Sequence, residues 1–166
     1  HYSLDLATLT CDWFELTDAH GAELLERTAF QKGDVLLADR NYSRCAGVRA
    51  ALEAGAHVVV RLRWAHGPMK GRDGRNFQAL THARKLRVGQ VGSWPVQLLD
   101  PQGESISGRV VAMRLPAPLA AKAERRVIRR STKRSQRLDP RSLQATHFVL
   151  LFTTLPTELL AARDVM

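Results

Sequence analysis

Acidic side chains recur near the ends of predicted strands in the first quarter of this sequence. They are Asp5, Asp12, Glu15, Asp18 and Asp39. Mg²⁺ prefers carboxylate oxygens in proteins, and two-metal phosphoryl transfer needs several of them converging from different strands. One acid after a strand is weak support for such a site, but an acid there on a chain with a concentrated basic segment favours action on nucleic acid.

Asp39 has the most informative position of these acids. It lies in the stretch GDVLLADRNY, directly after the continuous apolar run Val35–Ala38. Such a run predicts a strand buried on both faces of a sheet. In open α/β sheets, chemistry collects outside the carboxyl ends of the strands, so Asp39 is a candidate catalytic residue. Its alternative role is to cap the next helix or to pair with Arg40.

Positive charge is concentrated in one segment. The 166 residues carry a formal net charge of +9, and residues 122–141 contain nine basic and two acidic side chains, which account for +7 of it. This balance favours a polyanionic partner, most often nucleic acid. The candidate DNA-binding residues are Lys122, Arg125, Arg126, Arg129, Arg130, Lys133, Arg134 and Arg137.

Several function classes have no support in the sequence. HExxH, GxSxG, Walker and GxGxxG motifs are absent, and Cys11 and Cys45 lack the spacing of a metal knuckle or a disulfide framework. No apolar stretch approaches the roughly 18 residues of a membrane span, and we expect a cytoplasmic protein. Because the first residue is His1 rather than Met, we expect the chain to be part of a longer protein.

The hydrophobic pattern of residues 1–64 predicts the order strand, strand, helix, strand, helix, strand. Alternation predicts antiparallel strands at 1–10 and 11–16 with a turn at 10–12. Thr17 or Asp18 caps the first helix, and the second begins after Ser43 and stops at Gly55. This order indicates a mixed α/β sheet.

The last of these strands contains the buried run Val58–Val60. Arg61 and Arg63 follow the run on one face of the strand. They either contact phosphate or form the solvated face of an edge strand, and the residues alone leave both interpretations open.

The pattern changes in residues 65–145. Residues 65–76 predict a loop, residues from about 88 to 115 a β-hairpin with its turn at 101–103, and residues 119–141 a basic helix that frays into an arm near 131–132. A buried strand at 146–155 and a helix from Pro156 follow. We therefore predict a core of residues 1–64 and 146–166, interrupted by an insertion subdomain at 65–145.

Residues 39–42, Asp-Arg-Asn-Tyr, resemble the D-R-G-Y motif that carries the second catalytic Asp of DDE transposases from bacterial insertion sequences. The stretches HYSLDLATL, ELTDAHGAELLER, VVVRLRW and VLLFTTLP follow the order and spacing of that family, so the resemblance covers nearly the whole chain. It implies a ribonuclease H-like fold in which residues 65–145 are the family's β-rich insertion.

The resemblance also implies roles for individual residues. Asp39 would hold Mg²⁺ or Mn²⁺, Arg40 and Tyr42 would complete the motif, and Asn41 replaces the usual Gly. The family's first Asp would lie on a strand before residue 1, and its Glu in a Y-x-x-R-W-x-I-E helix after residue 166. This chain alone would then be inactive, whereas the intact protein, expected to be a homodimer, would cleave transposon ends and join them to target DNA.

Two other functions stay open. A non-catalytic DNA-binding module, or a decayed transposase remnant, would need the basic segment alone. A ribonuclease H-like nuclease of another type would need its own full set of acids.

Overall fold

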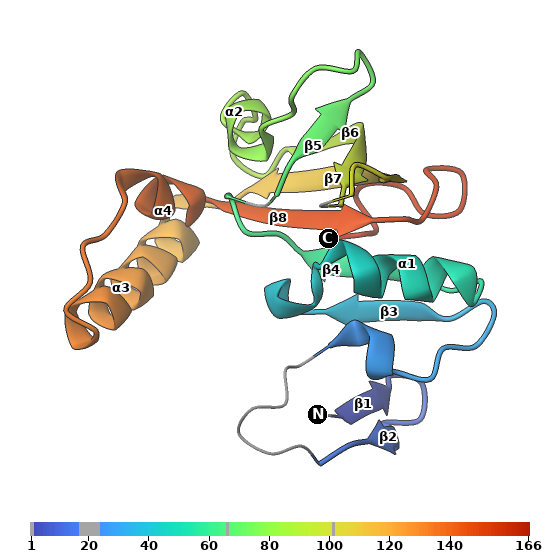
Figure 1. Ribbon diagram of the computed structural model, residues 1–166. Helices are drawn as coiled ribbons and strands as arrows, with labels where there is room; N and C mark the ends of the chain where they lie inside the picture. The colour runs from blue at the N-terminus through green and yellow to red at the C-terminus, as the bar shows by residue number, and fades with distance from the viewer. Residues whose placement is uncertain (1, 17–23, 66, 101) are drawn as a thin grey trace.

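The computed structural model describes residues 2–16, 24–65, 67–100 and 102–166. Six strands form one mixed sheet in the order β3-β4-β8-β7-β6-β5, and β1 and β2 form a separate antiparallel pair (Figure 1). The predicted mixed α/β class is confirmed, and the sheet is compatible with a ribonuclease H-like fold. In chain order the elements, with η for short 3₁₀ helices, are β1 (Tyr2–Asp5), β2 (Thr10–Phe14), η1 (Leu25–Arg27), β3 (Val35–Ala38), η2 (Arg40–Tyr42), α1 (Cys45–Glu53), β4 (His57–Arg61), β5 (Met69–Gly71), α2 (Ala79–Ala83), β6 (Val91–Leu99), β7 (Ser105–Arg114), α3 (Ala117–Lys133), α4 (Pro140–Ala145) and β8 (Phe148–Thr153).

Helix α1 connects the parallel strands β3 and β4. Val48 and Ala51 of α1 are buried in the core. The helix ends as predicted at Gly55, whose φ of 76° is the left-handed geometry that glycine adopts without strain. The predicted cap Ser43 is wrong, because its hydroxyl donates to the carbonyl of Arg40 (2.8 Å) and closes η2 instead.

The core lies on the central strands of the sheet. Val58 and Val60 of β4 are fully buried, which confirms the burial predicted for that run. They belong to one apolar cluster with Val110 of β7 and with Leu150 and Phe152 of β8. Packing of strands that are far apart in sequence therefore holds the sheet together.

The prediction that β3 is buried on both faces is wrong. Val35 is 49% exposed and Leu37 is 58% exposed, while Leu36 and Ala38 pack against the core. Within the described chain β3 pairs with β4 alone, so it is an edge strand with one covered face. A sequence run shows that a strand is apolar, but it does not show which layers are present to cover it.

The turn of the β1–β2 hairpin also differs from the prediction. Residues 10–12 belong to β2, and the turn lies at residues 6–9. The carboxylate of Asp5 fixes it by accepting hydrogen bonds from the Ala7 amide (2.8 Å) and the Thr8 hydroxyl (2.9 Å). The predicted caps Thr17 and Asp18 lie outside the described residues, and the described end of that predicted helix is only the short η1.

Strands β5, β6 and β7 extend the same sheet. The β6–β7 hairpin forms as predicted. Its predicted turn at 101–103 includes residue 101, which lies outside the described residues. The loop prediction for residues 65–76 missed β5, which pairs antiparallel with β6. The Phe77 amide also donates to the carbonyl of Met69 (2.8 Å) across the turn that follows β5. The division into a core and an insertion subdomain stays a prediction.

The end of the chain agrees with the prediction in one respect and differs in another. Helix α3 ends at Lys133, within two residues of the predicted point near 131–132, and residues 134–139 that follow are not helical. Residues 156–165 form turns rather than the predicted helix. Backbone carbonyls of this last segment accept hydrogen bonds from Arg109 of β7, a residue that is only 5% exposed. The Nε of Arg109 donates to the carbonyl of Leu155 (2.9 Å), and its Nη2 donates to the carbonyl of Leu160. Burial lowers the pKa of Arg109.

Because β7 and β8 pack closely at Gly108, we predict that Gly108→Ala destabilises the folded protein. A Cβ at this position would clash with the Phe152 ring and lie 2.7 Å from the carbonyl oxygen of Thr153. We expect a loss of about 1–3 kcal/mol in the free energy of unfolding, measured by urea denaturation. Gly67→Ala is the control, because a Cβ there meets no atom within 4 Å. Equal stability of the two variants would contradict the packing described.

Candidate functional site

Strands β3, β4 and β7 of the sheet point their carboxyl ends toward the same edge, and β5, at the far end of the sheet order, runs in the same direction. β3 is parallel to β4, and both β4 and β7 are antiparallel to β8. Asp39 follows β3, Arg63 and Trp64 follow β4, and α3 follows β7. Figure 1 shows α3 and α4 on the same side of the sheet as η2. The topology therefore brings the candidate acid and the basic segment to one edge, called here the carboxyl edge.

Asp39 lies exposed at the carboxyl edge. One carboxylate oxygen, Oδ1, accepts a hydrogen bond from the Arg40 amide (2.6 Å) and is 3.9 Å from the Arg40 Nε. The amide of Tyr42 donates to the Asp39 carbonyl (3.0 Å), which closes η2. Asp39 thus caps a helix and pairs with Arg40, as the alternative interpretation predicts. The side chain is 57% exposed, and its Oδ2 accepts no hydrogen bond from any described residue, so it is available to a ligand.

Arg61 and Arg63 are exposed near the end of β4. The edge-strand interpretation of these residues is wrong, because β4 lies between β3 and β8. Arg63 Nη2 donates to Asn41 Oδ1 (3.0 Å) and thereby links the end of β4 to η2 beside Asp39. Arg61 has no side-chain partner within the described part of the chain. Phosphate contact by either arginine stays a prediction.

The described residues do not form a divalent-metal site by themselves. No three His, Cys, Asp or Glu side chains in ranges 2–16, 24–65, 67–100 and 102–166 are grouped so that they hold a metal ion. Asp5 and Asp12 are engaged within the first hairpin, with Asp12 accepting from the Ser3 hydroxyl. Asp39 therefore supplies one candidate oxygen ligand, and the requirement of Mg²⁺ for several oxygen ligands is not met here.

Helix α3 presents a continuous basic face. Since an α-helix turns about 100° per residue, its basic side chains lie within a sector of about 140°, and buried Ala120 lies on the opposite side. All of them are exposed, and no described carboxylate forms an ion pair with them. The α3 basic face consists of Lys122, Arg125, Arg126, Arg129, Arg130 and Lys133; Arg134 and Arg137 follow it and are also exposed.

Helix α4 connects the basic segment to β4. The indole Nε1 of Trp64 donates to the Ser142 hydroxyl (3.1 Å), and the guanidinium of Arg141 lies 4.6 Å from the centre of the Trp64 ring. Arg141 also pairs with Asp139 (2.8 Å). Arg141 is therefore occupied within the protein, unlike the α3 basic face. No sequence signal indicated these contacts, because residues 64 and 142 meet only through the folded sheet.

Glu124 is the one acid on α3, and it points away from the α3 basic face. At 100° per residue it lies on the side of buried Ala120. Its carboxylate lies 3.1 Å from His147 Nε2 at the start of β8. This contact leaves the six basic side chains of the helix without a neutralising neighbour on their own face.

The sequence was also compared with those of known proteins. No family profile matches the sequence. The InsL proteins of insertion sequence elements IS186A and IS186B from Escherichia coli (strain K12) are each 28% identical over 170 residues, with 99% of this chain and 46% of the relative covered. The transposase for insertion sequence element IS421 from Escherichia coli has the same identity and coverage.

The chain is homologous to bacterial insertion-sequence transposases. The chain spans about half the length of the curated relatives it matches. None of the helices described is both long and apolar enough to cross a membrane.

The ion pair between Arg141 and Asp139 leads to a prediction about the pKa of the Asp139 carboxyl group. Hydrogen bonds from Arg141 lower the pKa of Asp139 below its usual 3.8. Arg141→Ala should therefore raise that pKa, measured from the carboxyl carbon shift by NMR. Because the folded-state pKa is lowered, any stabilisation from the pair is present at neutral pH and is lost as pH falls through that pKa. An unchanged titration in Arg141→Ala would contradict the pairing.

Proposed function

We propose that this chain is part of the catalytic region of an insertion-sequence transposase, with Asp39 as one of its catalytic acids. The observation that carries the proposal is the position of exposed Asp39 at the same sheet edge as the α3 basic face. Homology to insertion-sequence transposases over 99% of the chain supports it. The DDE mechanism, the homodimer and the use of transposon ends and target DNA are parts of the same proposal.

DNA would bind across the α3 basic face. Six exposed cations on one helical face, without ion pairs to described carboxylates, are free to neutralise phosphates. Arg134 and Arg137 extend this positive surface beyond the helix, and Arg61 adds a cation near Asp39. Binding of this kind follows the backbone and gives little sequence specificity.

Asp39 would act within a site completed by acids from outside the described residues. A divalent ion bound there would polarise a phosphate oxygen and activate the attacking hydroxyl. The chain's own contribution is positional. The amide of Arg40 and the Arg63–Asn41 hydrogen bond hold η2 at the end of β4, so that Asp39 presents its Oδ2 outward.

A non-catalytic DNA-binding module is the second candidate. The observation that favours it is the lack of a grouped set of metal-binding side chains among the residues described, beside a basic face that needs no catalytic partner. Both candidates predict DNA binding, and only the transposase proposal assigns a function to Asp39.

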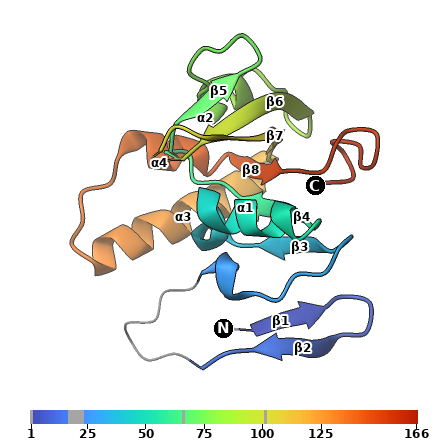
Figure 2. The same cartoon turned by 45° about the vertical axis from the view of Figure 1, so that its right-hand side comes forward.

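The first test is the salt dependence of duplex DNA binding by this chain. Arg125→Gln/Arg129→Gln should weaken binding and reduce the slope of log K against log salt by about 0.9 for each phosphate that the variant no longer neutralises. Arg72→Gln/Arg75→Gln removes the same charge from the turn after β5, which lies away from α3 in Figures 1 and 2, and is the matched control. An unchanged slope for the α3 variant would remove α3 from the DNA surface.

The second test concerns Asp39 in the full-length protein. Asp39→Asn should abolish strand cleavage in Mg²⁺ or Mn²⁺ without weakening DNA binding, because it removes a carboxylate ligand and none of the cations of the α3 basic face. Asp34→Asn is the control, since Asp34 lies before β3 at its other end and accepts a hydrogen bond from the Gln31 amide (2.8 Å). Cleavage by Asp39→Asn at the normal rate would overturn the proposal.

A further inference from the structure

Arg109 of β7 is a buried cation with one unsatisfied donor. It is 5% exposed and lies opposite Thr153 of β8 in the sheet. Its Nε and Nη2 donate to uncharged carbonyls, those of Leu155 and Leu160, whereas its Nη1 is buried and has no hydrogen-bond partner among the residues described. Taking a charged group out of water is costly unless its charge and its donors are satisfied. A negatively charged acceptor at Nη1 would satisfy both requirements.

The chain that follows β8 is folded around this guanidinium. The Leu155 amide donates to the hydroxyl of Thr153 (3.1 Å), and the Leu160 amide donates to the carbonyl of Pro156 (3.2 Å). This turn brings together the two carbonyls that the guanidinium binds. Figures 1 and 2 both show the chain looping out past the end of β8 and returning to the C-terminus beside that strand. Residues 155–160, called here the post-β8 segment, are therefore held on the sheet by a buried cation.

Glu158 is the carboxylate of the post-β8 segment. It lies in sequence between Leu155 and Leu160, is exposed, and forms no ion pair with any residue that the structure describes. Burial lowers the pKa of Arg109, and the negative charge of Glu158 opposes this shift, so the carboxylate is near enough to act on the guanidinium. Glu158 thus supplies charge of the required sign in the segment that Arg109 already binds.

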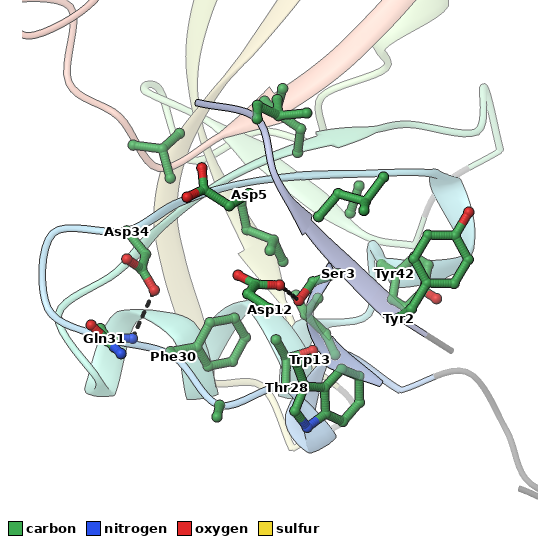
Figure 3. Close-up of a pocket in the computed structure, with 18 of the residues that line it drawn as sticks. Tyr2, Ser3, Asp5, Asp12, Trp13, Thr28, Phe30, Gln31, Asp34 and Tyr42 are labelled. Atoms are coloured by element: carbon green, nitrogen blue, oxygen red, sulfur yellow. Dashed lines mark hydrogen bonds between the residues drawn. The ribbon is translucent and has the colours of Figure 1, made fainter. Parts of the chain in front are cut away.

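The acids beside β3 are not available to Arg109. A cavity of about 940 Å³ is lined by β1 and β3 and by the carboxylates of Asp5, Asp12, Asp34 and Asp39. Figure 3 shows two of these acids engaged there, with the Ser3 hydroxyl donating to Asp12 and the Gln31 amide donating to Asp34. Strands β4 and β8 lie between this cavity and β7 in the sheet order. The partner of Nη1 must therefore come from the other side of the sheet order, where the post-β8 segment lies.

We propose that Glu158 is the partner of Arg109 Nη1, and that this ion pair closes the post-β8 segment as a latch on β7. Closure turns the carboxylate inward, covers Nη1 and compensates the buried charge. Arg109 and Glu158 are then positioning residues, because the latch fixes the direction in which the polypeptide leaves the sheet. This last step rests on the proposed function, in which acids from outside the described residues complete the site of Asp39.

Exchange of the Arg109 side-chain protons tests the latch without any activity. Arg109 is part of the core, so the change is made at exposed Glu158 in the full-length protein. Glu158→Gln should make the Nη1 protons of Arg109 and the amide proton of Leu160 exchange at least about threefold faster, measured by NMR. Glu53→Gln removes the same charge from the exposed end of α1 and should change neither rate. Unchanged exchange in Glu158→Gln would overturn the proposal.

The positioning role leads to a second prediction, about metal dependence. In the full-length protein, Glu158→Gln should raise the Mg²⁺ concentration for half-maximal strand cleavage about tenfold without weakening DNA binding, because displaced acids hold the ion less well. Glu53→Gln should keep the normal Mg²⁺ dependence. A normal Mg²⁺ dependence in Glu158→Gln would contradict the positioning role. Absence of cleavage by the unmodified protein would instead contradict the proposed function, and the exchange measurement would still decide whether the latch exists.

Discussion

The pairing of β4 between β3 and β8 is the interaction on which the arrangement of this protein depends. β4 is parallel to β3 and antiparallel to β8, which is in turn antiparallel to β7. The directions of these strands place Asp39, Arg63 and the start of α3 at one edge. Burial of Val58 and Val60 holds β4 in this position, so the hydrophobic effect on a central strand determines where polar residues of distant segments meet.

Polar contacts between side chains then fix the position of η2 and α4 relative to the end of β4. Arg63 binds Asn41 and holds η2 beside the end of β4, while Trp64 binds Ser142 and connects β4 to the basic segment. These hydrogen bonds are partly exposed, and each contributes modestly to stability. Their consequence is geometric, since they keep the acid-bearing turn and the helical segment attached to the same strand.

Much of this fold could be predicted from the sequence where local chemistry decides the outcome. Four features follow from apolar patterning and backbone preferences: the Val58–Val60 strand, the stop at Gly55, the β6–β7 hairpin and the basic helix.

The prediction failed where the structure of a segment depends on the elements that pack beside it. The run Val35–Ala38 looks buried in sequence, yet Val35 and Leu37 lie exposed because no described strand lies beyond β3. Short elements such as β5 and α4 depend on pairing with residues elsewhere in the chain, and their local pattern is too short to show it. The candidate acid was found from its place after a strand, but its position at the same sheet edge as the start of α3 follows only from the directions of the paired strands.

The central claim is that Asp39 and α3 face the same DNA. Photo-crosslinking of the full-length protein to duplex DNA tests this most directly, with the photoreactive residue placed in turn at position 41 beside Asp39, at position 126 on the α3 basic face, and at position 72 after β5. The account predicts crosslinks from positions 41 and 126 to one DNA molecule and none from position 72. Crosslinks from position 126 without any from position 41, or equal crosslinking from position 72, would contradict it.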